Sequence, residues 1–218
     1  MIIYNPANQP LLLKRIKAAE ELLQLIPVKH CFISGSFLYK ENYGDIDVFV
    51  ISRTKKKIEI KNKKVNLTML DFNQLHSLFY HSIAKSCIAK NILPQKTLKA
   101  TMSDYWQVIN EAVPTVLNHK TNFKKDIRFL VLYMEYFRTG KVLDTFELSQ
   151  KIEAFKNYKE VMKYIKDSVP KIISQHRKKS YLKRYFYTQA SYYKDVTGYD
   201  AQAVLYELAH QIVGEAHG

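Results

Sequence analysis

Residues 35–50 read GSFLYKENYGDIDVFV, and this stretch decides the fold that the sequence predicts. It opens with a Gly-Ser pair, continues through a short polar loop and ends in a run in which Asp45 and Asp47 alternate with apolar residues. Side chains two apart on a strand point to the same face. The pattern therefore predicts a strand that projects both carboxylates together, close to Gly35 and Ser36.

The residue types in this stretch suit a site for a metal-bound nucleoside triphosphate. Two adjacent carboxylates favour a hard cation such as Mg²⁺ or Mn²⁺, and Mg²⁺ commonly binds one or two carboxylates together with substrate phosphates. Gly35 allows a backbone to come close to a ligand, and Ser36 adds a small hydroxyl donor. Lys40 flanks the site and suits the neutralisation of phosphates. The alternative interpretation is a surface turn followed by a strand with two solvated aspartates.

The same residues resemble the signature of the nucleotidyltransferase (polymerase-β-like) superfamily. The resemblance consists of the Gly35-Ser36 turn, a short spacer, Asp45-Ile46-Asp47 and the apolar runs 31–33 and 48–51 on either side. It covers about residues 28–72 and is strongest to the small bacterial and archaeal members, which include aminoglycoside adenylyltransferases and minimal nucleotidyltransferases. It implies that Asp45 and Asp47 ligate the metal, that Gly35 and Ser36 hold the triphosphate, and that a nucleoside monophosphate is transferred to a hydroxyl acceptor.

The position of the third acid departs from the pattern of that superfamily. The resemblance implies an acid within an apolar-acid-apolar run on a neighbouring strand, and the matching run here is Val65-Asn66-Leu67. An amide oxygen can coordinate Mg²⁺ but cannot act as a general base. Three solutions stay open: Glu59 in the preceding basic run reaches the site, Asp126 or Glu135 in the helical half completes it, or the protein binds nucleotide without turnover.

Beyond the central stretch, the chain predicts an α+β fold in two parts. Apolar residues at helical spacing predict a helix over 10–25, and strands are predicted over 28–34, 45–52 and 65–70, followed by a helical pattern over 71–90. Past the break at 91–94 almost every segment has helical periodicity. We therefore predict a small mixed-sheet nucleotidyltransferase domain over residues 1–95 and an all-α helical domain over residues 96–218.

Composition limits the partners and the compartment. The formal net charge of +14 favours polyanions such as nucleotides or nucleic acid, although a lysine-rich genome explains it equally well. Residues 176–187 interleave basic and tyrosine side chains and are a candidate surface for RNA or DNA. The chain has only two cysteines, no signal-peptide pattern and no apolar run long enough for a membrane span, so we expect a cytoplasmic protein without a membrane partner.

The sequence thus predicts a Mg²⁺-dependent nucleotidyltransferase that uses a nucleoside triphosphate. The alternative is a catalytically inactive nucleotide- or RNA-binding regulatory module with the same fold. The acceptor stays open between a small molecule, a protein hydroxyl and an RNA end, and the oligomeric state stays open as well.

Overall fold

The computed structural model describes residues 1–53, 58, 60, 62–174, 201 and 203–208, and within them the chain forms two compact units. The first unit contains residues 1–100 and 142–150, and the second contains residues 101–141 and the described residues from 151 onward. The sequence places the division near residue 95, whereas the contacts divide the chain after Ala100. Residues 142–150 also belong to the first unit, which the sequence did not predict.

A mixed five-stranded sheet forms the centre of the first unit, in the order β1-β5-β2-β3-β4. Only the β3–β4 pair is parallel, and the other neighbours are antiparallel. The α+β class predicted from the sequence is therefore confirmed. The strands span β1 Ile2–Tyr4, β2 His30–Ser34, β3 Ile46–Ile51, β4 Val65–Leu70 and β5 Cys87–Ala89.

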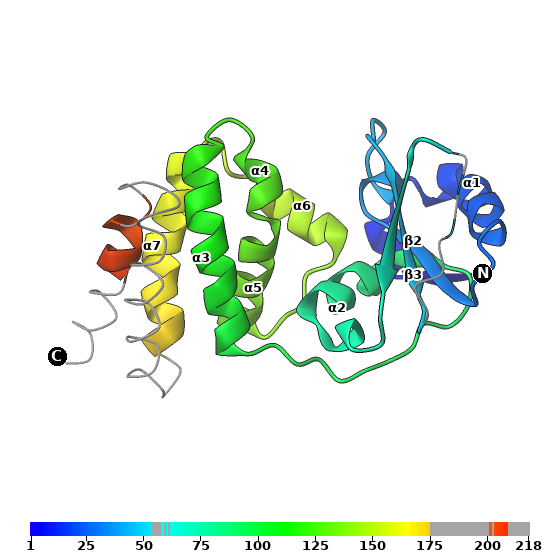
Figure 1. Cartoon of the computed structure of the whole chain (residues 1–218). Coiled ribbons are helices and arrows are strands. Elements are labelled where there is room, and N and C mark those ends of the chain that lie inside the picture. Colours follow the sequence, from blue (N-terminus) through cyan, green and yellow to red (C-terminus); the bar gives the residue numbers. More distant parts are fainter. Residues whose placement is uncertain (54–57, 59, 61, 175–200, 202, 209–218) are drawn as a thin grey trace. The chain divides into compact units, whose positions relative to one another are not determined.

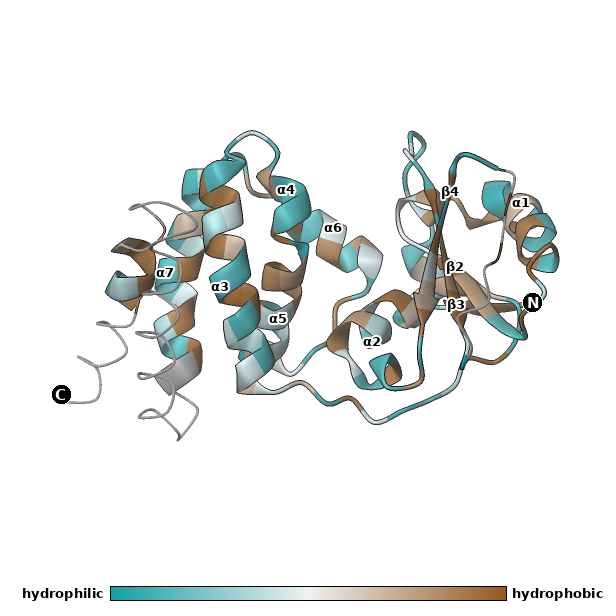
Figure 2. Cartoon of the chain, viewed as in Figure 1, coloured by the Kyte–Doolittle hydropathy of each residue, from teal (hydrophilic) through white to brown (hydrophobic). Residues whose placement is uncertain are grey.

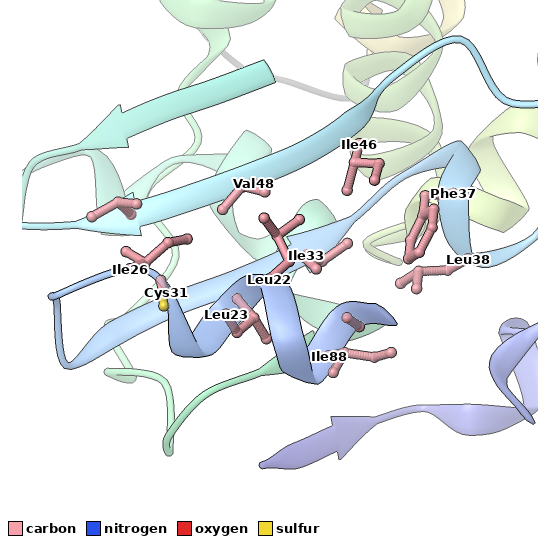
Figure 3. Packing of buried hydrophobic residues seen from close by; sticks show 12 residues of the cluster. Leu22, Leu23, Ile26, Cys31, Ile33, Phe37, Leu38, Ile46, Val48 and Ile88 are labelled. Carbon is pink, nitrogen blue, oxygen red and sulfur yellow. The ribbon is translucent and has the colours of Figure 1, made fainter. Parts of the chain in front are cut away.

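Two helices cover the two faces of this sheet (Figure 1). Helix α1, Leu12–Gln24, packs Leu22 and Leu23 against Ile33, Val48 and Ile88, as Figure 3 shows. Helix α2, Leu78–Lys85, packs on the other face with a second apolar cluster. Single 3₁₀ turns lie at Pro6–Asn8, Ser36–Leu38 and Gln74–His76.

Alternation along β3 assigns its residues to the two faces. Ile46, Val48 and Val50 belong to the cluster beneath α1, whereas Phe49 and Ile51 belong to the cluster beneath α2. Asp47 has the same parity as Phe49, so its side chain lies on the α2 face. The strand predicted over 45–52 and its alternation are confirmed for Ile46–Ile51, and Asp45 and Ser52 lie just outside it.

The helical pattern predicted over 71–90 is wrong in its last part. Helix α2 ends at Lys85, and Cys87–Ala89 forms β5, which is inserted between β1 and β2. A short apolar run has no periodicity that separates a buried strand from a buried helix. All three residues of β5 are buried, so tertiary pairing decides their conformation.

The second unit is helical in the part that the structure describes. Helices α3, α5 and α7 pack on one another, and their residues alternate between hydrophilic and hydrophobic along each helix (Figure 2). Pro114 and Pro170 lie inside α3 and α7. The bounds are α3 Met102–Asn118, α4 Phe123–Asp126, α5 Arg128–Thr139, α6 Thr145–Glu153 and α7 Tyr158–Ser174, and Ala201 and residues 203–208 are also helical. Helix α6 begins among the residues grouped with the first unit.

Among the described residues, no helix combines the length and the apolar character that a membrane crossing requires. The segment 176–187, proposed from the sequence as a nucleic-acid surface, lies outside the described residues.

Candidate functional site

Three neighbouring strands bring polar residues into one row at one end of the sheet. Asp47 on β3 is paired with Ser34 on β2 and with Asn66 on β4. Ser34 is the last residue of β2 and directly precedes Gly35. The row therefore places the predicted metal ligand Asp47 beside both the Gly-Ser turn and the position of the expected third acid.

Gly35 is required here for two independent reasons. Its φ of 90° and ψ of −161° lie in a region that is essentially restricted to glycine. A Cβ atom at this position would lie 2.8 Å from Oδ2 of Asp47. The sequence predicts that Gly35 makes room for a ligand, whereas in the structure the group nearest to the position of a Cβ is the Asp47 carboxylate.

The chain after Gly35 forms a single 3₁₀ turn, Ser36–Leu38. The amide of Leu38 donates to the carbonyl of Gly35 at 3.1 Å, and the amides of Tyr39 and Lys40 donate to the carbonyl of Ser36 at 3.1 and 2.8 Å. The first amides of such a turn have no partner inside it. The amides of Ser36 and Phe37 therefore lie at the N-terminal end of the turn. This end directly follows Gly35, which lies against the Asp47 carboxylate.

Asn66 bonds directly to Asp47. Its Nδ2 donates to Oδ1 of Asp47 over 3.1 Å, and the Asn66 side chain is exposed. Since an amide offers a carbonyl oxygen in addition to its donors, Asn66 can present Oδ1 to a cation while Nδ2 holds the carboxylate. The contact therefore brings the position of the expected third acid next to the predicted metal ligand.

Asp45 and Lys40 adjoin this group along the chain. Asp45 is exposed and lies one residue before β3, where the amide of Ile46 donates to the carbonyl of Lys64 at 2.8 Å. Lys40 ends the turn that begins at Ser36 and is half-buried. The contacts thus join Gly35, Asp47 and Asn66, and sequence proximity adds Ser36, Asp45 and Lys40.

The other candidates for the third acid have different placements. Glu59 and the neighbouring Lys55 to Lys57 lie outside the described residues. Asp126 lies in the second unit, where its Oδ2 is 3.1 Å from Nδ1 of His119.

Glu135 serves the interior of the second unit. Its side chain is 5% exposed and accepts hydrogen bonds from Arg138 at 2.7 Å and Tyr164 at 2.9 Å, with Lys151 at 3.1 Å. Burial alone would raise the pKa of Glu135, but the hydrogen bonds from these three groups outweigh it and lower the pKa. We therefore assign Glu135 a structural role in place of the catalytic role that the sequence left open.

Ser34 is the residue of this row that sequence reasoning missed. It is fully buried, and its Oγ donates to the carbonyl of Ser86, which directly precedes β5, at 3.2 Å. The sequence contained one signal for Ser34, because it is a polar residue at the end of an apolar strand and directly before a glycine. Its pairing with Asp47 depends on strand register and could not be read from the local sequence.

The donor set fits a nucleotide-bound cation better than a cation bound by protein alone. Among the described residues, no group of three or more His, Cys, Asp or Glu side chains is placed to hold a metal ion. Two aspartates and one amide oxygen leave the remaining coordination positions to phosphate and water, which is the usual arrangement for Mg²⁺.

Comparisons of the chain with protein-family models, with curated proteins and with solved structures give no match.

Proposed function

We propose that the protein is a Mg²⁺-dependent nucleotidyltransferase that moves a nucleoside monophosphate from a nucleoside triphosphate to a hydroxyl acceptor. The observation that carries the proposal is the position of Asp47. Its carboxylate lies over Gly35, whose missing side chain makes room for it, and is held by Asn66 on the parallel strand. A surface turn with solvated aspartates gives no reason for a glycine to accommodate a carboxylate.

The proposed reaction needs an anion site, a cation site and a proton acceptor. The acceptor oxygen forms a bond to the α-phosphorus, the bond from that phosphorus to the bridging oxygen breaks, and pyrophosphate leaves. The cation, when bound, neutralises charge on the phosphate oxygens. Asp45 and Asp47 would hold it, and the Gly35-Ser36 turn with Lys40 would hold the triphosphate.

The identity of the proton acceptor separates this proposal from the alternative function. Asn66 stands where a base is expected and cannot take the proton of the attacking hydroxyl. This observation favours the second candidate, a nucleotide- or RNA-binding module that keeps the fold without turnover. Transfer itself requires a base elsewhere, or an acceptor whose hydroxyl loses its proton to solvent.

The test uses nucleoside triphosphates labelled at the α-phosphate, because only that phosphate stays with the transferred group. The protein is incubated with each nucleotide, Mg²⁺ or Mn²⁺, and separate small-molecule, protein and RNA fractions of a cell extract. We expect label in one fraction with the wild type and none with Asp47→Asn. Nucleotide binding without transfer to any fraction would support the binding module, and the absence of transfer, of nucleotide binding and of RNA binding would refute both functions.

The matched control is Asp71→Asn. Asp71 follows the last residue of β4, at the opposite end of the parallel β3–β4 pair, and its Oδ1 accepts the amides of Asn73 and Gln74. An asparagine at this position keeps an acceptor oxygen for both amides. Transfer should therefore survive Asp71→Asn while it is lost in Asp47→Asn.

A further inference from the structure

Asp144 is a fully buried carboxylate of the first unit, and it is separated in sequence from residues 1–100, which form most of that unit. Its Oδ2 accepts hydrogen bonds from Nδ2 of Asn5 at 2.9 Å and from Nδ2 of Asn8 at 2.6 Å. Its Oδ1 accepts the amides of Phe146 at 3.0 Å and Glu147 at 2.9 Å, at the start of α6. One carboxylate thus satisfies four donors and joins residues 142–147 to the N-terminal segment.

Glu147 and Lys85 strengthen the same junction. Oε2 of Glu147 accepts the amide of Asp144 at 3.0 Å, which completes a reciprocal cap on α6. Nζ of Lys85 donates to that oxygen at 2.9 Å and to the carbonyl of Val142 at 2.7 Å. We call the segment 142–147 with these contacts the return clamp.

Two paths of contact lead from the return clamp to the candidate site. In the first, the ring of Phe146 packs edge-on against Tyr39 at a centroid distance of 5.5 Å. Tyr39 directly follows the 3₁₀ turn that starts at Ser36. This path therefore reaches the end of the turn.

The second path runs through buried polar groups. The Ser86 hydroxyl donates a hydrogen bond to the carbonyl of Asn5 at 3.4 Å, and the Ser34 hydroxyl donates one to the carbonyl of Ser86 at 3.2 Å. Ser34 precedes Gly35 and is paired with Asp47. Both ends of the segment 34–39 are therefore in contact with residues that the clamp holds.

We propose that Asp144 is a positioning residue for the candidate site, which it serves by fixing the segment 34–39 against Asp47. The proposal rests on the proposed function only in calling the site a nucleotide site. Asp144 itself touches neither Gly35 nor Asp47, and its effect passes through Asn5, Ser86 and Phe146.

The test compares Asp144→Asn with Lys90→Met. In Asp144→Asn, one amide cannot accept from two asparagine side chains and two backbone amides without leaving a donor unpaired. Lys90 also ties two segments of the first unit, because its Nζ donates to the carbonyl of Ile26 at 2.7 Å. It lies near the start of β2, at the end opposite to Ser34, since its amide donates to the carbonyl of Cys31.

Hydrogen exchange gives a readout that does not depend on nucleotide. We expect Asp144→Asn to speed exchange of the Leu38, Tyr39 and Lys40 amides by roughly tenfold, because these amides are bonded within the turn. Lys90→Met should leave them unchanged. Equal acceleration in both variants, or none in Asp144→Asn, would overturn the positioning role.

Calorimetry with Mg²⁺ and the α,β-methylene analogue of ATP, which cannot transfer its nucleotidyl group, supplies the functional readout. Asp144→Asn should weaken binding by roughly tenfold, because a small misplacement of a binding group carries a large penalty. Lys90→Met should bind like the wild type. If the wild type binds no nucleotide but exchange in the turn still responds to Asp144→Asn, the proposed function fails and the positioning role remains.

Two further variants keep the proposal falsifiable if Asp144→Asn does not fold. Phe146→Leu keeps the cap and the asparagine contacts and removes only the ring contact with Tyr39, so it should speed exchange in the turn to a smaller extent. The double variant Asn5→Asp with Asp144→Asn exchanges the carboxylate and the amide across one of the four hydrogen bonds but leaves Nδ2 of Asn8 without its acceptor, so it should restore slow exchange only in part. Failure of both expectations would refute the proposal.

Discussion

The side chains of Asn66 and Asp47 are hydrogen-bonded across the parallel strands β4 and β3, with 3.1 Å between Nδ2 and Oδ1. An aspartate at position 66 would place two carboxylates side by side, and without a cation they would repel each other. Asparagine removes that repulsion and keeps an oxygen ligand. The bond therefore stabilises the Asp47 carboxylate in the absence of a cation.

We expect Asn66→Asp to make the protein more dependent on divalent cations. Without metal the new carboxylate faces Asp47, so the melting temperature should fall, and Mg²⁺ should restore it. If the wild type lacks only its base, turnover should rise, because general-base assistance contributes roughly 10²–10⁴-fold. Melting curves with and without Mg²⁺ and the α-label assay measure the two effects.

Asn62→Asp is the control for this variant. Asn62 is exposed and its Oδ1 accepts the amide of Lys64 at 3.0 Å, a contact that an aspartate retains. It should change neither the metal dependence of melting nor turnover. A melting temperature of Asn66→Asp that does not respond to Mg²⁺ would contradict the assignment of position 66 to the metal site.

Asp45→Asn and Asp47→Asn should each weaken the binding of Mg²⁺-nucleotide without unfolding the protein. The amide introduced by Asp47→Asn retains an oxygen that can accept from Asn66, and both changes lower the negative charge of the site, so the melting temperature should hold or rise slightly. Titration calorimetry and thermal melting measure affinity and stability separately. A large drop in melting temperature in either variant would show that the residue is structural and would remove it from the site.

Gly35→Ala should destabilise the protein more than Gly140→Ala. Both glycines have positive φ, 90° and 72°, and such backbone strain costs about 1–3 kcal/mol in a residue with a side chain. A Cβ at Gly140 meets nothing within 4 Å, whereas a Cβ at Gly35 meets Oδ2 of Asp47 at 2.8 Å. Gly140 lies in the left-handed helical region, whereas the backbone of Gly35 is nearly restricted to glycine, so the difference in unfolding free energy, from urea titration, measures the steric contact and the additional backbone strain together.

A double-variant cycle identifies the partner of Gly35. Truncation in Asp47→Ala removes the carboxylate that the new methyl group would meet, so Gly35→Ala should be less harmful in that background. An unchanged penalty would show that Asp47 does not set the requirement for glycine at position 35.

Acid should destabilise the second unit through Glu135. Its pKa in the folded protein is lowered, so its ionisation contributes stability that is present above the unfolded value of about 4.3 and is lost as the pH falls through the folded value. Glu135→Gln should cost roughly 1–3 kcal/mol near neutral pH, because it leaves the partners of a buried carboxylate incompletely paired. It should also flatten the dependence of unfolding free energy on pH below about 4.3.

Glu153→Gln is the matched surface control. Glu153 pairs with Lys124 at 2.7 Å, but the two side chains are 53% and 39% exposed. Exposed pairs contribute only about 0–1 kcal/mol, so this variant should leave both the stability and its acid dependence close to those of the wild type. Equal losses in the two variants would contradict the role assigned to the Glu135 cluster.

The sequence by itself determined the features that depend on local periodicity. The alternation in residues 65–70 placed Asn66 on the face opposite to Val65, Leu67 and Met69, and the cluster beneath α1 contains those three side chains. The spacing in residues 10–25 predicted α1. Each of these signals arises within a few residues, where a period of 2 or 3.6 is visible.

Only the tertiary structure decided the features that depend on contacts between distant segments. Cys87–Ala89 became a strand because β1 and β2 pair with it on either side. Asp144 joined the first unit because Asn5 and Asn8 donate to it, and Glu135 became a structural group because Lys151 and Tyr164 reach it. The partner of Gly35 proved to be Asp47 through strand register. No local pattern encodes these pairings, since their free energy comes from burial and hydrogen bonds between residues far apart in the chain.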